Sequence, residues 1–255
     1  MTHFYLFVLA ASTLLFTGAG CTHYYYAPNT LRTPFLQQQH DAQMNLGLIS
    51  GDEFSGYELH GVYSPLKHAA VMVNHMYINS DVSTGNESGK GWLTEVALGA
   101  YFPAGKYSSF SLFGGWGGGG VINTYDLNVS SDLRFRRTFL QPAFTFQAKW
   151  VRFGTAVRFS RLQYVRGDVD VEIGEPDLTI IRNIERDSPI FLPETGFFCG
   201  FGYRPFWADF HLNFSNFMNT YDPDEYNFAQ ATLAVSFSCQ LDHFWRKRAA
   251  KPGVR

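Results

Sequence analysis

The fold of this chain is decided by the stretch DFHLNFS at residues 209–215, which alternates between polar and apolar side chains. Successive side chains of an extended strand point to opposite faces, so Phe210, Leu212 and Phe214 share one face. The aspartate, histidine, asparagine and serine of the stretch share the other face. Such a strand separates an apolar environment from a polar one, and the fold depends on which of the two is the interior.

The same alternation recurs along the chain, and the polar faces carry charged residues and histidines. An arginine or lysine that faces lipid near the bilayer midplane costs about 2–4 kcal/mol. We therefore expect the charged faces to enclose a lumen and the apolar faces to meet lipid. Both signs of charge are present, so the lumen residues can pair with one another. The predicted lumen charge network is Glu58, His60, Glu95, Arg137, Lys149, Arg152, Arg158, Asp209 and His211.

Segments of strand character follow one another along the chain, with no convincing amphipathic helix between them. Most have the roughly 9–11 residues that a tilted strand needs to cross a bilayer. The sequence therefore predicts an all-β fold, a closed antiparallel up-and-down transmembrane β-barrel of about ten strands, over residues 41–241. The predicted strands are residues 41–50, 55–64, 68–78, 92–102, 108–121, 134–149, 151–165, 192–203, 207–217 and 227–241.

The connections between the predicted strands alternate in length. Every odd connection is a loop, such as residues 122–133, and every even connection is a short turn, such as residues 64–67. Outer-membrane barrels have short periplasmic turns and longer loops outside, so this alternation places both chain ends in the periplasm. Within the longest connection, residues 166–191, we expect two strands to continue above the membrane as a hairpin. A twelve-strand barrel is the rival interpretation, and it would break the alternation.

The composition of the 255 residues is typical of such a barrel, with 17% aromatic residues, 24 glycines and only 16% charged residues. Beyond the N-terminus there is no stretch of about 18 apolar residues, which argues against a helical membrane protein. The net charge of -2 gives no electrostatic case for binding nucleic acid. Tyrosine and tryptophan near the strand ends suggest two aromatic girdles at the membrane interfaces. The girdle residues are Tyr63, Tyr101, Tyr107, Trp150, Tyr203 and Trp207 by the turns, and Trp92, Tyr125 and Tyr164 by the loops.

Residues 1–20 are typical of a bacterial signal peptide. The apolar run from Phe4 to Phe16 has the length of the hydrophobic region of such a peptide and is too short to span a bilayer. Small residues then precede Cys21, as in the lipobox of bacterial lipoproteins, so we predict that Cys21 is acylated. Ordinary cleavage at this point, leaving a free thiol, is the alternative. We expect residues 21–40 to form an extended, irregular periplasmic linker and residues 242–255 a basic periplasmic tail.

The chain resembles the small outer-membrane barrel families, including the lipobox-bearing barrels of Bacteroidota-type bacteria. The resemblance lies in the region of Cys21, in the linker Tyr26-Ala27-Pro28-Asn29 with Pro34-Phe35, and in the hairpins from Asp41 to Leu241. It implies an outer-membrane location and carries over no catalytic residue. We expect outer-membrane lipid and the barrel-assembly machinery as partners.

We expect a structural or surface-interaction role, because bulky charged side chains would largely plug the narrow lumen of about ten strands. A narrow solute channel and an outer-membrane enzyme with an active site at the rim are alternatives. A further alternative is a soluble periplasmic lipoprotein barrel that binds an apolar ligand, with apolar residues inside and charges outside. We expect no enzymatic activity, cofactor or metal site, since the sequence does not bring the rim carboxylates and a histidine together. The rim candidates are His75, Asp126, Asp168, Asp170 and Asp187.

Overall fold

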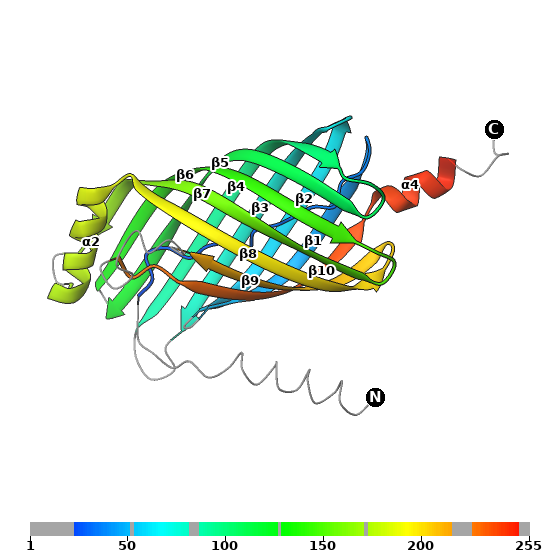
Figure 1. Cartoon of the computed structure of the whole chain (residues 1–255). Helices are drawn as coiled ribbons and strands as arrows, with labels where there is room; N and C mark the ends of the chain where they lie inside the picture. Colours follow the sequence, from blue (N-terminus) through cyan, green and yellow to red (C-terminus); the bar gives the residue numbers. More distant parts are fainter. Residues whose placement is uncertain are drawn as a thin grey trace, which may run out of the picture.

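The computed structural model describes residues 23–51, 54–81, 87–126, 129–170, 173–215 and 226–249. Ten strands close into one barrel (Figure 1). Each strand pairs antiparallel with its neighbours in the sequence, and β1 pairs with β10 to close the cylinder. This confirms the predicted fold class. The strands are β1 (Ala42–Ser50), β2 (Ser55–Leu66), β3 (Ala69–Asp81), β4 (Ser88–Pro103), β5 (Ser108–Asp126), β6 (Val129–Gln147), β7 (Val151–Val169), β8 (Ile190–Tyr203), β9 (Phe206–Ser215) and β10 (Ala231–Gln240).

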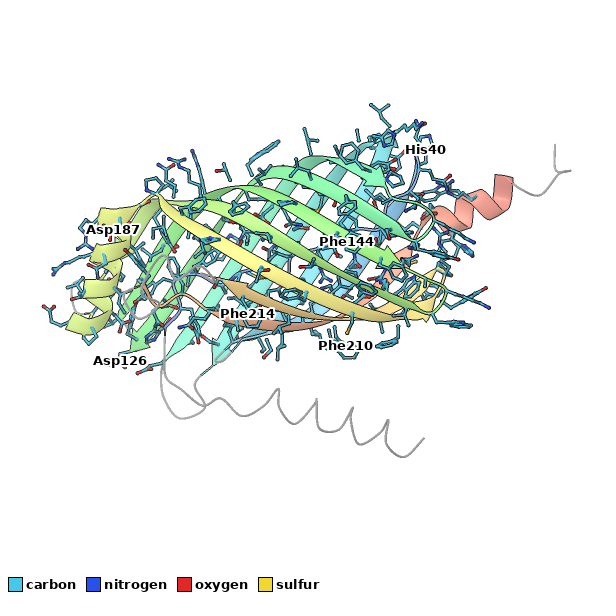
Figure 2. The ribbon with its side chains drawn as sticks, in the orientation of Figure 1. His40, Asp126, Phe144, Asp187, Phe210 and Phe214 are labelled. Atoms are coloured by element: carbon cyan, nitrogen blue, oxygen red, sulfur yellow. The ribbon has the colours of Figure 1, made fainter. Side chains whose placement is uncertain are left out.

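The exterior of the barrel is apolar, as the alternation predicts. Phe210 is 46% exposed and Leu48 is 71% exposed, whereas Asp209 and His211 on either side of Phe210 are buried. Figure 2 shows Phe210 and Phe214 on the outer surface of the wall. The polar face of the opening sequence stretch therefore points inward and its apolar face points outward.

The aromatic girdle is present only in part. Tyr63, Trp150 and Tyr203 are exposed beside the short turns, as predicted. Tyr101 and Trp207 are fully buried instead, so their predicted interfacial positions are wrong. Trp207 shares the inward face of β9 with the polar residues, and nearness to a strand end does not by itself tell which face a side chain occupies.

Strands β4 to β7 have 16 to 19 residues each and are longer than the other strands. The loop predicted at residues 122–133 is therefore wrong, because β5 continues to Asp126 and β6 begins at Val129. Asn123 and Ser131 are paired across these extensions, and both are buried. We call the band of exposed apolar side chains around the exterior of the barrel the apolar belt. The extensions of β5 and β6 continue the sheet beyond this belt with polar side chains.

The hairpin predicted within residues 166–191 is also wrong, because β7 is followed by helix α2 (Glu175–Asp187). Pro176 lies in the first turn, where its fixed φ favours the start of a helix. Ile181 and Ile184 are three residues apart and are both buried. The apolar residues that suggested a strand have the spacing of a helix face as well.

We name the two openings of the barrel after the helices beside them, the α2 end and the α4 end (Figure 1). Helix α4 (Asp242–Ala249) follows β10, so the predicted basic tail begins as a helix. Arg246 of this helix pairs with Asp41 at 2.8 Å, just before β1. The four short turns lie at the α4 end. Among the described residues, no helix is both long and apolar enough to span a bilayer.

The predicted periplasmic linker, residues 21–40, is the largest departure from the sequence analysis. Residues 23–36, which we call the plug segment, run through the lumen from the α2 end to the α4 end (Figure 1). At the α2 end, the backbone N–H of Tyr25 donates to the carbonyl of Asn227 at 3.3 Å. The extended conformation of these residues agrees with the prediction. Their predicted location in the periplasm is wrong, because they lie inside the barrel. An enclosed segment touches the wall on every side, so it shows no periodic pattern.

At the α4 end, Ser109 Oγ donates to the carbonyl of Leu36 at 2.8 Å, and a turn then leads into β1. The first described residues and helix α4 therefore lie at opposite ends of the barrel. The prediction that both ends of the chain lie on one side is wrong for the described residues. Residues 1–22, which include the predicted signal peptide and Cys21, lie outside the described residues.

Candidate functional site

The lumen is where the predicted charges gather. Lys149 is the exception, because it lies exposed in the turn between β6 and β7, and its predicted lumen position is wrong. Strand β6 ends at Gln147, so the alternation no longer determines which way Lys149 points. The other predicted residues are all buried in the lumen: Glu58, His60, Glu95, Arg137, Arg152, Arg158, Asp209 and His211.

The first ion-pair cluster lies around Asn29 of the plug segment. The Asn29 side-chain oxygen accepts hydrogen bonds from Arg137 and Arg158, each at 2.6 Å, and its amide nitrogen donates to Glu95 at 3.0 Å. Arg137 also pairs with Glu95 at 2.6 Å. Both arginines lie 3.6 Å from Glu194, on opposite oxygens of its carboxylate. The amide of Asn29 thus matches the charges of the wall, with its oxygen toward guanidinium groups and its nitrogen toward a carboxylate.

The second cluster joins Arg32 of the plug segment to Glu58 of β2. Arg32 Nη2 lies 3.0 Å from Glu58 Oε2, and the backbone N–H of Thr30 donates to Glu58 Oε1 at 2.6 Å. Arg32 Nη1 donates to Ser236 Oγ at 2.8 Å and lies 2.8 Å from His211 Nε2. A guanidinium only donates, so His211 Nε2 accepts this bond and carries no proton.

The third cluster lies between Arg152 of β7 and Asp209 of β9. Arg152 Nε donates to Asp209 Oδ1 at 2.7 Å, and a second guanidinium nitrogen contacts the other oxygen, which makes the pair bidentate. The guanidinium also lies 5.0 Å from the ring centroid of Trp207. This pair belongs entirely to the wall and needs no partner from the plug segment.

The wall and the plug segment differ in charge. In the described lumen, the ion pairs of the wall contain one carboxylate more than they contain arginines, and Arg32 supplies the missing cation. The wall groups are Arg137, Arg152, Arg158, Glu58, Glu95, Glu194 and Asp209. A buried charge without a partner is strongly destabilising. The plug segment therefore stabilises the wall by supplying the cation that pairs with Glu58.

Sequence reasoning missed Glu194 and Arg32. A signal for Glu194 was available in the sequence, because Phe191, Phe197 and Phe201 share the odd-numbered face of β8 and so predict that the even-numbered face points inward. No comparable signal exists for Arg32, which lies in a segment without periodicity.

Little open space is left where the plug segment passes the second and third clusters. A cavity of about 10 Å³ lies between the plug segment and the wall, lined among others by Thr33, His60 and His211. A cavity of this size has room for about one water molecule. At this level of the described lumen, side chains and the plug segment therefore occupy the place where a channel would run.

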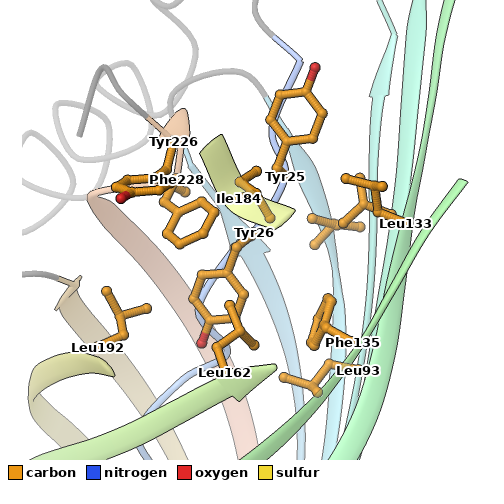
Figure 3. Packing of buried hydrophobic residues seen from close by; sticks show 14 of the residues in the cluster. Tyr25, Tyr26, Leu93, Leu133, Phe135, Leu162, Ile184, Leu192, Tyr226 and Phe228 are labelled. Atoms are coloured by element: carbon orange, nitrogen blue, oxygen red, sulfur yellow. The ribbon is translucent and has the colours of Figure 1, made fainter. Parts of the chain in front are cut away.

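An apolar cap closes the α2 end above the ion pairs (Figure 3). Tyr26 of the plug segment packs there with Ile184 of α2 and Phe228. Polar contacts hold the cap at its edge, where Tyr226 and Arg186 both donate to the carboxylate of Asp187. Arg186 and Tyr226 together lower the pKa of Asp187 from 3.8 to about 2, so this carboxylate is ionised at neutral pH.

The rim candidates for catalysis are not brought together. His75 lies on the exterior of β3 and bonds to Thr94 Oγ1 at 2.8 Å, rather than to a carboxylate. Asp168 pairs with Arg166, and Asp170 accepts a bond from the backbone N–H of Ser130 at 2.7 Å. In the described ranges, no group of three or more histidine, cysteine, aspartate or glutamate side chains could hold a metal ion.

No protein-family model and no curated protein matches the sequence. Among solved structures, the translocator domain of the autotransporter NalP from Neisseria meningitidis is similar, with a TM-score of 0.39 and 7% sequence identity. The match covers 79% of this chain and 87% of that one. Similarity at this level identifies no family.

Replacing Arg32 with methionine would leave the Glu58 carboxylate buried without its guanidinium. We expect the free energy of unfolding, measured by denaturant titration in detergent, to fall by about 3–5 kcal/mol. Lys149→Met is the control, because it removes a charge from an exposed turn and should change the free energy by less than about 0.5 kcal/mol. The double variant R32M/E58Q should regain part of the loss. No recovery in the double variant would contradict the ion pair as the cause.

Proposed function

We propose that this chain is an integral β-barrel of a bacterial outer membrane, closed by its own plug segment, with a structural or surface-interaction role. The observation that carries the proposal is the orientation of the wall. Large apolar side chains are exposed on all ten strands, while the ion pairs fill the interior. Soluble monomers rarely expose contiguous apolar patches above a few hundred Å². In a bilayer, the same exterior is the favourable one.

The alternative of a soluble barrel that binds an apolar ligand requires the inverse arrangement. Its charges would face water and its lumen would be apolar. Instead, Arg137, Arg158 and Glu194 are 0% exposed inside the barrel, and Leu46 and Phe237 are more than half exposed outside it. The structure contradicts this alternative.

A closed lumen favours a scaffold over a solute channel. To open a path, the plug segment would have to leave, which would break the contacts of Asn29 with Arg137, Arg158 and Glu95 and the pair of Arg32 with Glu58. The parts left for interaction are then the surfaces at the α2 end, where the longest connections and helix α2 lie. By analogy with barrels that carry their longer loops outside, we assign the α2 end to the cell exterior.

Phe210→Arg tests the membrane-facing exterior. Phe210 lies in the middle of β9, so an arginine there should lower stability in lipid by about 2–4 kcal/mol, whereas Phe210→Leu should be nearly neutral. Wild type should require detergent for extraction and show a heat-shifted band on SDS gels, and Phe210→Arg should lose the shift at a lower temperature. Release of wild type without detergent, or equal tolerance of arginine and leucine, would contradict the membrane assignment.

Planar bilayers test the closure of the lumen. The purified full chain should give no steady current, because the plug segment and the paired side chains fill the described lumen. An open porin reconstituted in the same bilayers serves as the control for insertion and detection. Sustained unit currents from the wild type would favour the narrow solute channel instead.

Acylation of Cys21 remains part of this proposal. Cys21 lies two residues before His23, whose Nε2 is 3.3 Å from the carbonyl of Thr124 at the α2 end. Two extended residues span about 7 Å at most, so acyl chains on Cys21 would enter the leaflet on the α2 side. Radioactive palmitate should label wild type and not Cys21→Ala, and the unlabelled variant should keep its heat-shifted band. Equal labelling of both proteins would exclude acylation at Cys21.

A further inference from the structure

Four arginines lie on the exterior of β6 and β7, beyond the apolar belt on its α2 side. Arg134 and Arg166 are directly opposite each other in register. Each has its own carboxylate two residues along its strand: Arg134 pairs with Asp132 at 2.7 Å, and Arg166 pairs with Asp168. The side chains farther from the belt are therefore neutralised within the protein.

The other two arginines, Arg136 and Arg161, are exposed and have no such carboxylate. None of their cross-strand neighbours on this face is acidic, and none of the next residues on the same face of either strand is acidic. The cross-strand neighbours are Gly118 and Gln163 for Arg136, and Thr138 and Phe191 for Arg161. Among the described residues, the neighbours of these two cations on this face therefore supply no anion.

Register places these two side chains within reach of one ligand. Arg136 is opposite Gln163, and Arg161 is opposite Thr138, so the two arginines are diagonal neighbours on one face. Diagonal neighbours in a sheet are about 7–8 Å apart, which long side chains bridge easily. Two like charges at this separation repel each other, and an anion held between them turns that repulsion into attraction.

The position of the pair indicates the kind of anion. Beyond the paired Thr138 and Arg161, the next exterior pair toward the α4 end is Leu140 on β6 and Phe159 on β7, which belong to the apolar belt. On β4, across Gly120 of β5, the ring centroid of Trp92 lies 4.2 Å from the guanidinium carbon of Arg134, and tryptophan is enriched at membrane interfaces. Arg136 and Arg161 therefore lie at the level where acyl chains end and headgroups begin.

We propose that Arg136 and Arg161 bind the phosphate of an anionic lipid headgroup in the leaflet on the α2 side. This inference rests on the proposed membrane-spanning function. The guanidinium groups donate to the phosphate oxygens, and Gln163 and Thr138 offer further hydrogen bonds beside them. The acyl chains of the same lipid lie along Leu140 and Phe159, and this contact distinguishes a lipid from a free phosphate ion.

The test measures phosphatidylglycerol binding to the detergent-solubilised full chain by native mass spectrometry. The double variant R136Q/R161Q should bind phosphatidylglycerol about 30-fold more weakly than wild type, while weak binding of zwitterionic phosphatidylcholine should not change. R136K/R161K should keep most of the affinity, because lysine also binds phosphate. An excess of inorganic phosphate should not displace the lipid from wild type.

The matched control is K67Q/K149Q, which removes two exposed lysines from turns at the α4 end and should bind phosphatidylglycerol like wild type. Equal weakening in this control, wild-type binding by R136Q/R161Q, or displacement by inorganic phosphate would each overturn the proposal. All variants are first checked for the heat-shifted band, so a misfolded variant is recognised before binding is measured. Extraction of wild type without detergent would instead contradict the membrane-spanning function itself.

Discussion

Buried charge is the constraint on which this barrel depends. A wall with Glu58, Glu95, Glu194 and Asp209 turned inward must hold a cation beside each carboxylate, since an uncompensated ion in such an interior is strongly destabilising. Three arginines of the wall meet most of this need, and Arg32 meets the rest. The plug segment is therefore a part of the fold, although it belongs to no strand and forms no regular structure.

The paired charges and the plug segment must also fit into the limited space inside the barrel. Four guanidinium groups and a threaded chain fit only because the inward face also contains glycines. A Cβ on Gly117 would lie 2.6 Å from Glu95 Cγ, and a Cβ on Gly196 would lie 2.9 Å from Leu31 of the plug segment. The glycines of β5 and β8 thus leave room for the ion pairs and for the plug segment.

The alternation of polar and apolar residues predicted correctly which face of a strand each side chain occupies. It could not predict features that depend on contacts between distant parts of the chain. Phe210 and Asp209 occupy opposite faces because the period of a strand is two, and that rule located the strands and most of the buried charges. The predicted lumen position of Lys149 was wrong because β6 ends before this residue. The location of the plug segment, residues 23–36, could not be predicted from the sequence. Its Asn29 contacts three wall residues from different strands, and such contacts leave no local pattern in the sequence.

The contacts of Arg32 link the closing seam of the barrel to the plug segment. The pair of Arg32 with Glu58 spans 26 residues, whereas the contact of Arg32 with Ser236 spans 204, so these bonds join both edges of the sheet. Those edges are β1 with its neighbour β2 and the last strand, β10, which meet at the closing seam. A sheet that closed without the plug segment would bury Glu58 unpaired beside that seam. In the closed barrel, Arg32 supplies that partner and holds the plug segment and the seam together.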